Sequence, residues 1–404
     1  MAPILTTIAW IFLLLGLLPA LYLGLLAVVA LVPSPKKQLE GGVEKTIAVV
    51  VPAHNEQLLI AQTVTGLLQQ NYPKQAFTVF VIADNCSDPT AKLAADAGAR
   101  VLERQANPGK GQALHEAFSL LLEEDWDALL VVDADTQMHP NTLARIADTL
   151  LNGEDVVQVR YGVLNPEESW RTAAMELALA SFNALRPMGK NRLGSSSGLF
   201  GNGFCLSRKA LTQVPYLADS IVEDLEYHLQ LLHAGFRVRF LDDVWVKAQM
   251  PATAADSRSQ RVRWERGRFG LVRLLAPGLL RDLLKGRGFA LHALIDVCML
   301  PVSLIGLCLM PPLLLGAYSL AANTFASDTL AANTSGAYTV GALALLGMAA
   351  LGFHYFAAAL RYGHLGRTVK VALHVPWYVI WKTWALFSSF IKQRSLGWIR
   401  TKRH

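Results

Sequence analysis

From Met1 to Pro35 the chain contains no Asp, Glu, Lys or Arg, and Ile4 to Val32 is almost continuously apolar. About 20 apolar residues suffice to cross a bilayer as a helix, so this segment predicts a membrane span. A cleaved signal peptide is the alternative, but the segment lacks a basic start and exceeds the apolar length of such peptides. Lys36 and Lys37 follow, and the positive-inside rule places them in the cytoplasm and the N-terminus outside.

A second region of lipid-like composition lies between Gly288 and Leu360, where Asp296 and Asp328 are the only formal charges. We predict one crossing over residues 289–320, broken or kinked at its prolines, and another over residues 338–360. The prolines concerned are Pro301, Pro311 and Pro312. Aromatic and basic residues over 371–391 are typical of an interfacial segment. Counting the first helix, about three spans are expected, with four or five left open.

Composition supports this division of the chain. Apolar residues make up 52% of the 404 residues and charged residues 17%, which excludes a disordered chain and is unusual for a fully soluble protein. The net charge of +6 is too small to indicate nucleic-acid binding, so no nucleic-acid partner is expected, but it fits a protein near anionic lipid headgroups. The four cysteines have no zinc-ligand spacing and are interpreted as reduced thiols.

Between the two apolar regions, residues 45–275 have the pattern of an α/β domain. Short β-branched runs at Thr46–Val51, Thr78–Ala83 and Ala128–Val132 are typical of buried parallel strands. Helix-period segments at Glu56–Gln70 and Lys110–Glu124 alternate with them. This alternation predicts a Rossmann-like, mostly parallel sheet. Neither a GxGxxG nor a GxxxxGK[ST] motif follows, which disfavours a nicotinamide-binding domain and a P-loop ATPase.

Polar clusters follow the three strand-like runs in turn. They contain Glu56 after the first run, Asp84 after the second, and Asp133 and Asp135 after the third. Open α/β sheets bind ligands at the carboxyl ends of their strands. Two carboxylates at such an end can offer hard oxygen ligands to a divalent cation that bridges a diphosphate. We therefore predict a metal–diphosphate site, against the alternative of a solvated acidic turn.

Three further segments carry candidate site residues. Asn107–Gly111 precedes a helix, so its backbone N–H groups and Lys110 can meet phosphate, although a plain helix start explains it nearly as well. Glu223 and Asp224 open another helix, where a carboxylate can stay ionised as a general base. Gln260, Arg263 and Trp264 can grip a leaving diphosphate and an acceptor sugar, or form a basic helix face.

Taken in order, these motifs resemble the family 2 glycosyltransferases with a GT-A fold. The resemblance is carried by VPAHNE at 51–56, Asp84, DAD at 133–135, VED at 222–224 and QxxRW at 260–264. It covers about residues 47–270 and is strongest for the membrane-integrated branch, which includes cellulose, chitin-oligosaccharide, poly-N-acetylglucosamine and hyaluronan synthases and the ceramide glucosyltransferases.

The resemblance implies a role for each matching position. Asp224, with Glu223 beside it, is implied as the catalytic base, and Asp135 with Asp133 as the metal ligands. The implied donor-binding residues are Ala53, Glu56, Asp84, Lys110, Asp133, Gln260, Arg263 and Trp264. The implied acceptor residues are Asn202, Gly203 and Trp264.

The implied reaction is an inverting displacement in which a sugar leaves a nucleotide diphosphate, of the UDP type, with Mg²⁺ or Mn²⁺ as cofactor. Val222 stands where polymer synthases carry Thr or Glu, and Phe200–Cys205 matches the acceptor-contacting segment only loosely, so the acceptor stays open between a lipid and a glycan. The alternatives are a processive β-glycan synthase coupled to secretion and a non-catalytic membrane scaffold or transporter. The expected location is the bacterial cytoplasmic membrane, with the catalytic domain inside, the basic helices that follow it at the headgroups, and membrane lipids as partners.

Overall fold

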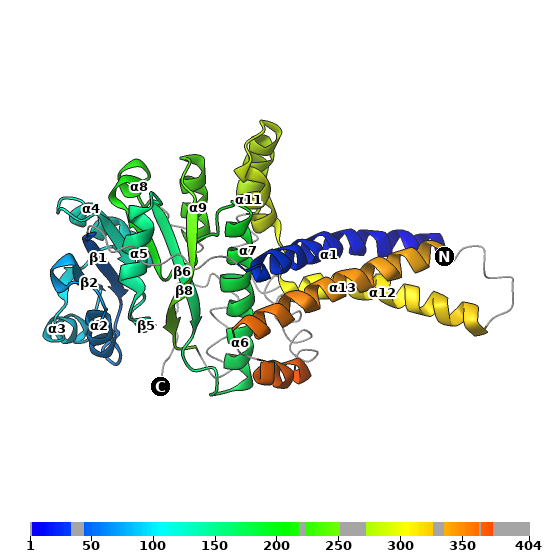
Figure 1. Cartoon of the computed structure of the whole chain (residues 1–404), viewed down its shortest axis with the longest axis horizontal. Coiled ribbons are helices and arrows are strands. Elements are labelled where there is room, and N and C mark those ends of the chain that lie inside the picture. Colours follow the sequence, from blue (N-terminus) through cyan, green and yellow to red (C-terminus); the bar gives the residue numbers. More distant parts are fainter. Residues whose placement is uncertain are drawn as a thin grey trace. The chain divides into compact units, whose positions relative to one another are not determined.

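The computed structural model describes residues 2–33, 44–217, 223–250, 272–325, 335–362 and 365–374. The chain divides into two compact units (Figure 1). One unit contains Met1–Val32 and Phe269–Trp398, and the other is formed mainly by Pro33–Arg268. The long apolar helices therefore belong to the first unit and the sheet to the second.

A mixed sheet of eight strands forms the centre of the second unit within the described residues. Its strands are β1 (Ile47–Ala53), β2 (Phe77–Asp84), β3 (Arg100–Arg104), β4 (Ala128–Val131), β5 (Thr136–Met138), β6 (Val156–Val163), β7 (Phe204–Ser207) and β8 (Val238–Ala248). They lie in the order β3-β2-β1-β4-β7-β6-β8-β5. Strands β3, β2, β1 and β4 pair in parallel, as do β6 and β8. Strand β7 is antiparallel to β4 and β6, and β5 is antiparallel to β8.

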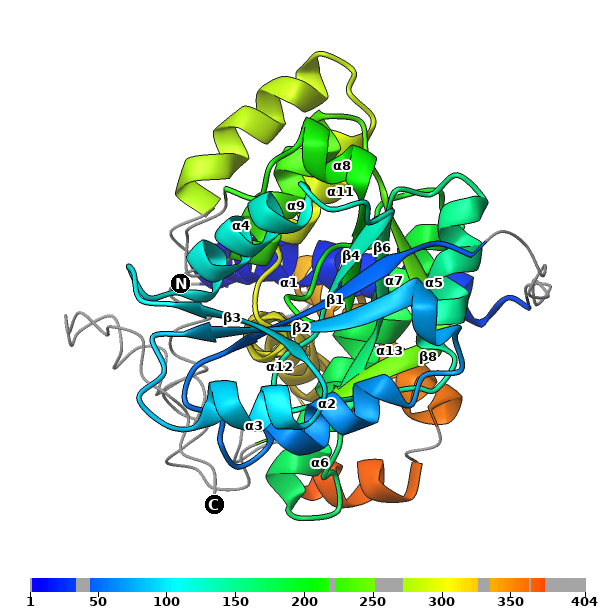
Figure 2. The same cartoon turned by 90° about the vertical axis from the view of Figure 1, so that its left-hand side faces the viewer.

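Helices cover both faces of this sheet. Figure 2 shows α2 (Ile60–Leu68) and α3 (Thr90–Asp96) on one side, and α4 (Lys110–Leu121), α8 (Arg208–Gln213) and α9 (Glu223–His233) on the other. Alternate residues of β1 pack against the helices on the two faces of the sheet: Val49 packs on the α2 side and Val50 on the α4 side. Helix α5 (Thr142–Leu151) joins the α2 layer. A parallel strand buried on both faces explains why the first run is apolar at consecutive positions.

A long helical segment follows β6. It consists of α6 (Trp170–Ala180), the π-helical turn η2 (Ser181–Leu185) and α7 (Arg186–Arg192). Ser169 caps its start, because its hydroxyl accepts from the Thr172 N–H at 3.2 Å while the Thr172 side chain accepts from the Ser169 N–H. In the second unit, the short 3₁₀ helix η1 (Lys74–Ala76) precedes β2.

The predicted fold class is confirmed, and the predicted strands coincide with β1, β2 and β4 within one or two residues. Strand β8 is the longest of the sheet, with 11 residues. The pairing of β8 with β6 is interrupted between Val159 and Arg160, where Leu241 and then Trp245 are the partners. The residues between them form a bulge, which explains the break in the apolar pattern.

The first unit contains three helices that are long and apolar enough to cross a membrane, among the residues described. They are α1 (Ala2–Leu31), α12 (Val302–Phe325) and α13 (Ser335–Arg361). Helices α12 and α13 approach very closely, since a Cβ atom built on Gly316 would lie 2.6 Å from the Gly341 Cα atom. The His354 ring, on α13, bonds through Nδ1 to the Leu23 carbonyl of α1 at 2.9 Å. Small residues and polar contacts, among them the bond from the Tyr338 hydroxyl to the Ser319 carbonyl at 3.1 Å, thus join these helices.

The region predicted as one crossing over residues 289–320 is two helices. Helix α11 (Phe289–Cys298) ends before Pro301, and α12 begins at Val302. Pro311 and Pro312, by contrast, lie inside α12. A proline is tolerated where a helix begins, so the break falls at Pro301. Of the segment expected at the interface over residues 371–391, only residues 371–374 are described, and they are helical.

Candidate active site

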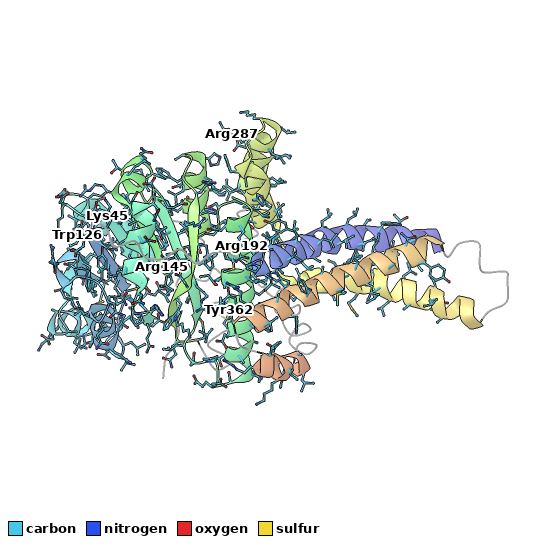
Figure 3. The ribbon with its side chains drawn as sticks, in the orientation of Figure 1. Lys45, Trp126, Arg145, Arg192, Arg287 and Tyr362 are labelled. Carbon is cyan, nitrogen blue, oxygen red and sulfur yellow. The ribbon has the colours of Figure 1, made fainter. Side chains whose placement is uncertain are left out.

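The polar clusters predicted at the strand ends lie at one edge of the sheet. Ala53 pairs with Ala83 across β1 and β2, and Val50 pairs with Val131 across β1 and β4. The segments after these strands therefore emerge side by side, as expected for parallel neighbours. Figure 3 labels Lys45 at the start of β1, where its Nζ atom lies 2.8 Å from Asp127 Oδ1, so this ion pair marks the opposite edge.

Asp84, the last residue of β2, is buried, and both its carboxylate oxygens accept hydrogen bonds. Oδ1 accepts from Arg104 Nη1 at 2.5 Å and from Asn85 Nδ2 at 2.7 Å. Oδ2 accepts from the Gly109 N–H at 3.1 Å. A carboxylate held by a guanidinium and two N–H donors has a defined direction. The end of β2 is thereby joined to the loop before α4.

Ala53 ends β1, and Glu56 stands at the end of the short loop that follows it. The loop between them contains Asn55, whose φ of 55° is unusual for a residue other than glycine. The His54 ring contacts the Asp84 carbonyl through Nδ1 at 2.7 Å, and the Glu56 N–H donates to Thr90 Oγ1 at 2.8 Å. These contacts fix the loop after β1 against the loop after β2.

Lys110, the first residue of α4, joins two other segments of the site. Its Nζ atom donates to Asp133 Oδ1 at 2.5 Å and to the Gly201 carbonyl at 2.6 Å. Burial alone would lower the pKa of Lys110, but the charges of Asp133 and Glu223 outweigh it and raise the pKa above its ordinary value. The ammonium therefore stays charged between the two acidic segments.

The turn that carries Asp133 and Asp135 is held through its backbone. The Asp133 N–H donates to Asn202 Oδ1 at 3.1 Å, and Thr63 Oγ1 donates to the Ala134 carbonyl at 2.7 Å. Asn202 Nδ2 donates to Thr136 Oγ1 at 2.9 Å, so one amide brackets the turn from both sides. Both Asp133 and Asp135 remain half-buried, which leaves them accessible from the edge of the sheet.

Glu223 and Asp224 begin helix α9, as the sequence predicted. Desolvation by burial, together with the neighbouring Glu223 carboxylate, raises the pKa of Asp224 to about 7. Lys110 acts in the opposite direction. A carboxyl group with a pKa near neutrality is suited to accept and release a proton at physiological pH.

Asn202 and Gly203, which were expected at the acceptor, lie between the turn and the core. Asn202 is 1% exposed, and both ends of its amide bond to the turn after β4. Gly203 has a φ of 70°, and a Cβ atom there would lie 2.6 Å from Val246 Cγ2, so only glycine fits. Their role in acceptor binding stays a prediction.

Three predicted site residues, Gln260, Arg263 and Trp264, lie outside the described residues. The structure does bring together Asp84, Lys110, Asp133 and the Glu223–Asp224 pair, which come from four separate segments. Sequence reasoning missed Arg104 and Gln158, two buried polar residues that hold this site. For Arg104 the signal was available, since a cation ending a strand beside Asp84 needs a partner.

The carboxylate oxygens at the end of β4 fit a divalent cation that also binds a diphosphate. No group of three His, Cys, Asp or Glu side chains suitable for a metal occurs in the described parts of the chain. Mg²⁺ is commonly held by one or two carboxylates together with substrate phosphates. Asp133 and Asp135 supply two such carboxylates at the end of β4, so a substrate phosphate would complete the coordination.

Comparison with known proteins agrees with this arrangement. Residues 45–267 match the family described as "Glycosyltransferase like family 2". The chain is 26% identical over 232 residues to the "Probable glycosyltransferase YdaM" of Bacillus subtilis (strain 168), covering 55% of this chain and 54% of that protein. It is 29% identical over 242 residues to the beta-monoglucosyldiacylglycerol synthase of Trichormus variabilis, covering 57% and 50%. The chain thus spans about half the length of the curated relatives it matches.

Among solved structures, the chain resembles mannosyltransferase PcManGT from Pyrobaculum calidifontis, which was determined with GDP-Man and Mn²⁺. The TM-score is 0.56 at 17% identity, with 89% of this chain and 99% of that chain covered. At this identity the similarity shows a shared fold.

Proposed function

Because the chain belongs to the family described as glycosyltransferase like family 2, we propose that it moves a sugar from a nucleotide diphosphate to a membrane-associated acceptor. The UDP carrier, the metal requirement and the lipid acceptor belong to this proposal. The observation that carries it is the convergence of Lys110, the Asp133 turn and Asp224 at the carboxyl edge of a GT-A sheet.

A sugar transfer needs positive charge beside the leaving diphosphate and a proton acceptor beside the acceptor hydroxyl, and the site provides these on two different sides. Lys110 contacts Asp133 directly, and its ammonium also interacts electrostatically with the Glu223 and Asp224 carboxylates. The diphosphate side is therefore cationic once Asp133 and Asp135 bind a divalent ion, which neutralises the charge on the departing nucleotide. The acceptor side carries a carboxyl group with a pKa of about 7. Such a division suits a leaving anion on one side and a proton acceptor on the other.

In the proposed reaction the Asp224 carboxylate takes the proton from an acceptor hydroxyl. The hydroxyl oxygen forms a bond to the anomeric carbon as the bond from that carbon to the diphosphate breaks. The leaving nucleotide diphosphate keeps the electron pair, and the configuration of the sugar is inverted. Gln260, Arg263 and Trp264 are proposed to bind the diphosphate and the acceptor entrance, while Ala53, Glu56 and Asp84 bind the nucleoside.

A lipid acceptor is favoured over a growing glycan by the first unit. Three candidate spanning helices are present in the described chain, and they pack on one another at small residues. This close packing leaves little room for a polar path through them. One relative is a synthase of a glycolipid by name, beta-monoglucosyldiacylglycerol synthase. The processive alternative requires further helices or a partner chain.

Membrane association is also supported by the helix over residues 272–284. Its Leu274, Leu280 and Leu284 are 74%, 49% and 81% exposed, and the helix also carries Arg273 and Arg281. Arg287 lies just beyond this helix and pairs with Asp282 at 3.2 Å (Figure 3). This mixture of apolar and basic residues is suited to the headgroup region of a bilayer. We place the catalytic unit on the cytoplasmic side and the N-terminus outside.

The test is nucleotide diphosphate release by the full chain in detergent with diacylglycerol and with soluble oligosaccharides as acceptors. UDP- and GDP-sugars are compared with Mg²⁺, Mn²⁺ and EDTA. We expect metal-dependent release from one donor with the lipid acceptor, and loss of release in Asp224→Asn. Release that needs an oligosaccharide and yields a lengthening product would support the processive alternative. No release from any donor with either acceptor would contradict the proposal.

A further inference from the structure

Gln158 is a polar side chain in the centre of the sheet. It lies on β6, between β7 and β8, and is 0% exposed. Its neighbours along the strand, Val157 and Val159, belong to the hydrophobic core. Burial of an amide among apolar residues is unfavourable unless hydrogen bonds compensate it. The position therefore calls for partners, and the structure supplies them.

The side chain of Gln158 has one hydrogen-bond partner on its own strand, the Val159 carbonyl. All its other partners lie in the turn of residues 200–203. Nε2 donates to the Asn202 carbonyl at 2.7 Å and approaches the Gly203 carbonyl at 3.1 Å. Oε1 accepts from the Phe200 N–H at 3.0 Å. The orientation of the amide follows from this set, because the reversed amide would place its oxygen against the carbonyls. One side chain thus holds both ends of the 200–203 turn.

The same turn holds the predicted metal and donor residues. The side chain of Asn202 brackets the turn after β4, through the Asp133 N–H and Thr136 Oγ1. The Gly201 carbonyl accepts from Lys110 Nζ at 2.6 Å. A Cβ atom on Gly201 would lie 3.8 Å from Asp224 Oδ2, so the turn also borders the proposed base. The four residues 200–203 therefore contact the Asp133 turn and Lys110, and they border Asp224.

We propose that Gln158 is a positioning residue, which sets the geometry of Asp133 and Lys110 through the 200–203 turn. The inference rests on the proposed function, since it concerns the residues assigned there to the metal and the diphosphate. Gln158 itself touches neither, as it lies behind the turn on the core side. Groups behind metal ligands typically change metal affinity or activity by about 10- to 100-fold when replaced.

The chain offers a matched control, Gln70. It is 3% exposed, its Nε2 donates to the His139 carbonyl at 3.0 Å, and its Oε1 accepts from the Leu143 N–H at 3.3 Å. These partners follow strand β5, so the hydrogen bonds of Gln70 reach neither the 200–203 turn nor residues 133–136. Gln158→Glu and Gln70→Glu remove the same donor from equally buried amides.

The experiment measures Mn²⁺ binding with UDP and with GDP by electron paramagnetic resonance, and hydrogen exchange of residues 133–136 in the ligand-free full chain. Thermal unfolding is recorded for every variant. We expect Gln158→Glu to weaken Mn²⁺–nucleotide binding by about tenfold or more and to speed exchange over 133–136. Gln70→Glu is expected to change neither, even where it lowers the unfolding temperature by as much.

Thr136→Val gives an independent test should Gln158→Glu not fold, because it keeps the side-chain volume and removes only the hydroxyl that Asn202 contacts. It is expected to weaken binding in the same direction. Equal effects of Gln158→Glu and Gln70→Glu, or unchanged binding and exchange in Gln158→Glu and Thr136→Val, would overturn the positioning role alone. A wild-type chain that binds Mn²⁺ with neither nucleotide would overturn the proposed function, and the inference with it.

Discussion

The Arg104 guanidinium and the Asp84 carboxylate form an ion pair of 2.5 Å in which each side chain is less than one-tenth exposed. Arg104 ends β3 and Asp84 ends β2, so the pair joins two strand ends. Arg104 also donates to the Asn107 carbonyl at 3.0 Å and to Glu116 at 2.8 Å on α4. The loop that precedes Lys110 is thereby attached to the residue proposed to bind the nucleoside.

Replacing Arg104 by Met should destabilise the catalytic unit by about 3–5 kcal/mol, because it leaves a buried carboxylate without its partner. Arg100→Met is the control on the same strand, since the Arg100–Glu124 pair is largely exposed and is expected to contribute about 1 kcal/mol or less. Urea unfolding of the detergent-solubilised chain measures both. Equal losses in the two variants would mean that the buried pair has no special role.

Lys110→Met should have opposite effects on two ligands. Without nucleotide, its removal frees Asp133 Oδ1 and takes a positive charge from the site, so Mn²⁺ should bind more tightly. The affinity for a nucleotide diphosphate should fall, by about tenfold, because a charge-assisted contact to phosphate is lost. Titration of Mn²⁺ with and without UDP measures both. Weaker Mn²⁺ binding to the nucleotide-free variant would contradict the idea that Lys110 competes with the metal for Asp133.

Activity should rise with pH around neutrality, because Asp224 has a pKa of about 7 and must lose its proton to act as a base. The expected profile of kcat/KM against pH has an ascending limb near that value. Replacing Glu223 by Gln removes the like charge that helps to raise the pKa, so the limb should move to lower pH. A limb that stays in place in Glu223→Gln would show that another group titrates.

The stability of the folded chain should also depend on the protonation of Asp224, but it should fall as the pH rises. The pKa of Asp224 is higher in the folded chain than its ordinary value of 3.8, so the folded state binds more protons between about pH 4 and pH 7. Stability is therefore lost as the pH rises through this window. Asp224→Asn should be more stable than the wild type at pH 8, by a few kcal/mol at most, and this advantage should disappear near pH 4. Thermal unfolding across this range measures it.

Gly203→Ala should destabilise the chain far more than Gly153→Ala. Both glycines have positive φ values, 70° and 87°, so both variants carry a similar backbone cost of about 1 kcal/mol. Only at Gly203 does the added Cβ meet the side chains of Val246 and Val159, at 2.6 and 2.7 Å, which should add about 1–3 kcal/mol. Chemical denaturation compares them. Similar midpoints would contradict the close packing beneath the 200–203 turn.

Gly341→Val should separate α12 from α13, because the Cα atoms of Gly341 and Gly316 leave no space for a larger side chain. Gly352→Val on the same helix is the control, since a Cβ atom there meets nothing within 4 Å. The expected result is a lower unfolding temperature in detergent for Gly341→Val alone. A similar decrease in both variants would indicate an effect of helix propensity rather than of packing.

Much of the local structure was predictable from short-range patterns. The first 35 residues and the later apolar regions identified the candidate spans, because length and lack of charge are sufficient criteria. The parallel strands β1, β2 and β4 were predictable as short apolar runs, and Asp84, Asp133 and Asp224 stood out by following or opening such elements. Strand β7, which lies antiparallel between β4 and β6, and the helices α6 and α7 had no comparably distinct pattern.

What the sequence determined by itself was which residues carry charge or apolar surface, and at which strand ends and helix starts they stand. The tertiary structure alone decided which of them meet. Lys110 and Asp133 are separated in sequence by the whole of α4, yet their atoms lie 2.5 Å apart because α4 begins and β4 ends at the same edge of the sheet. Gln158 contacts the 200–203 turn because β6 and β7 pair. Such contacts depend on strand order and register, which the local pattern of residues does not contain.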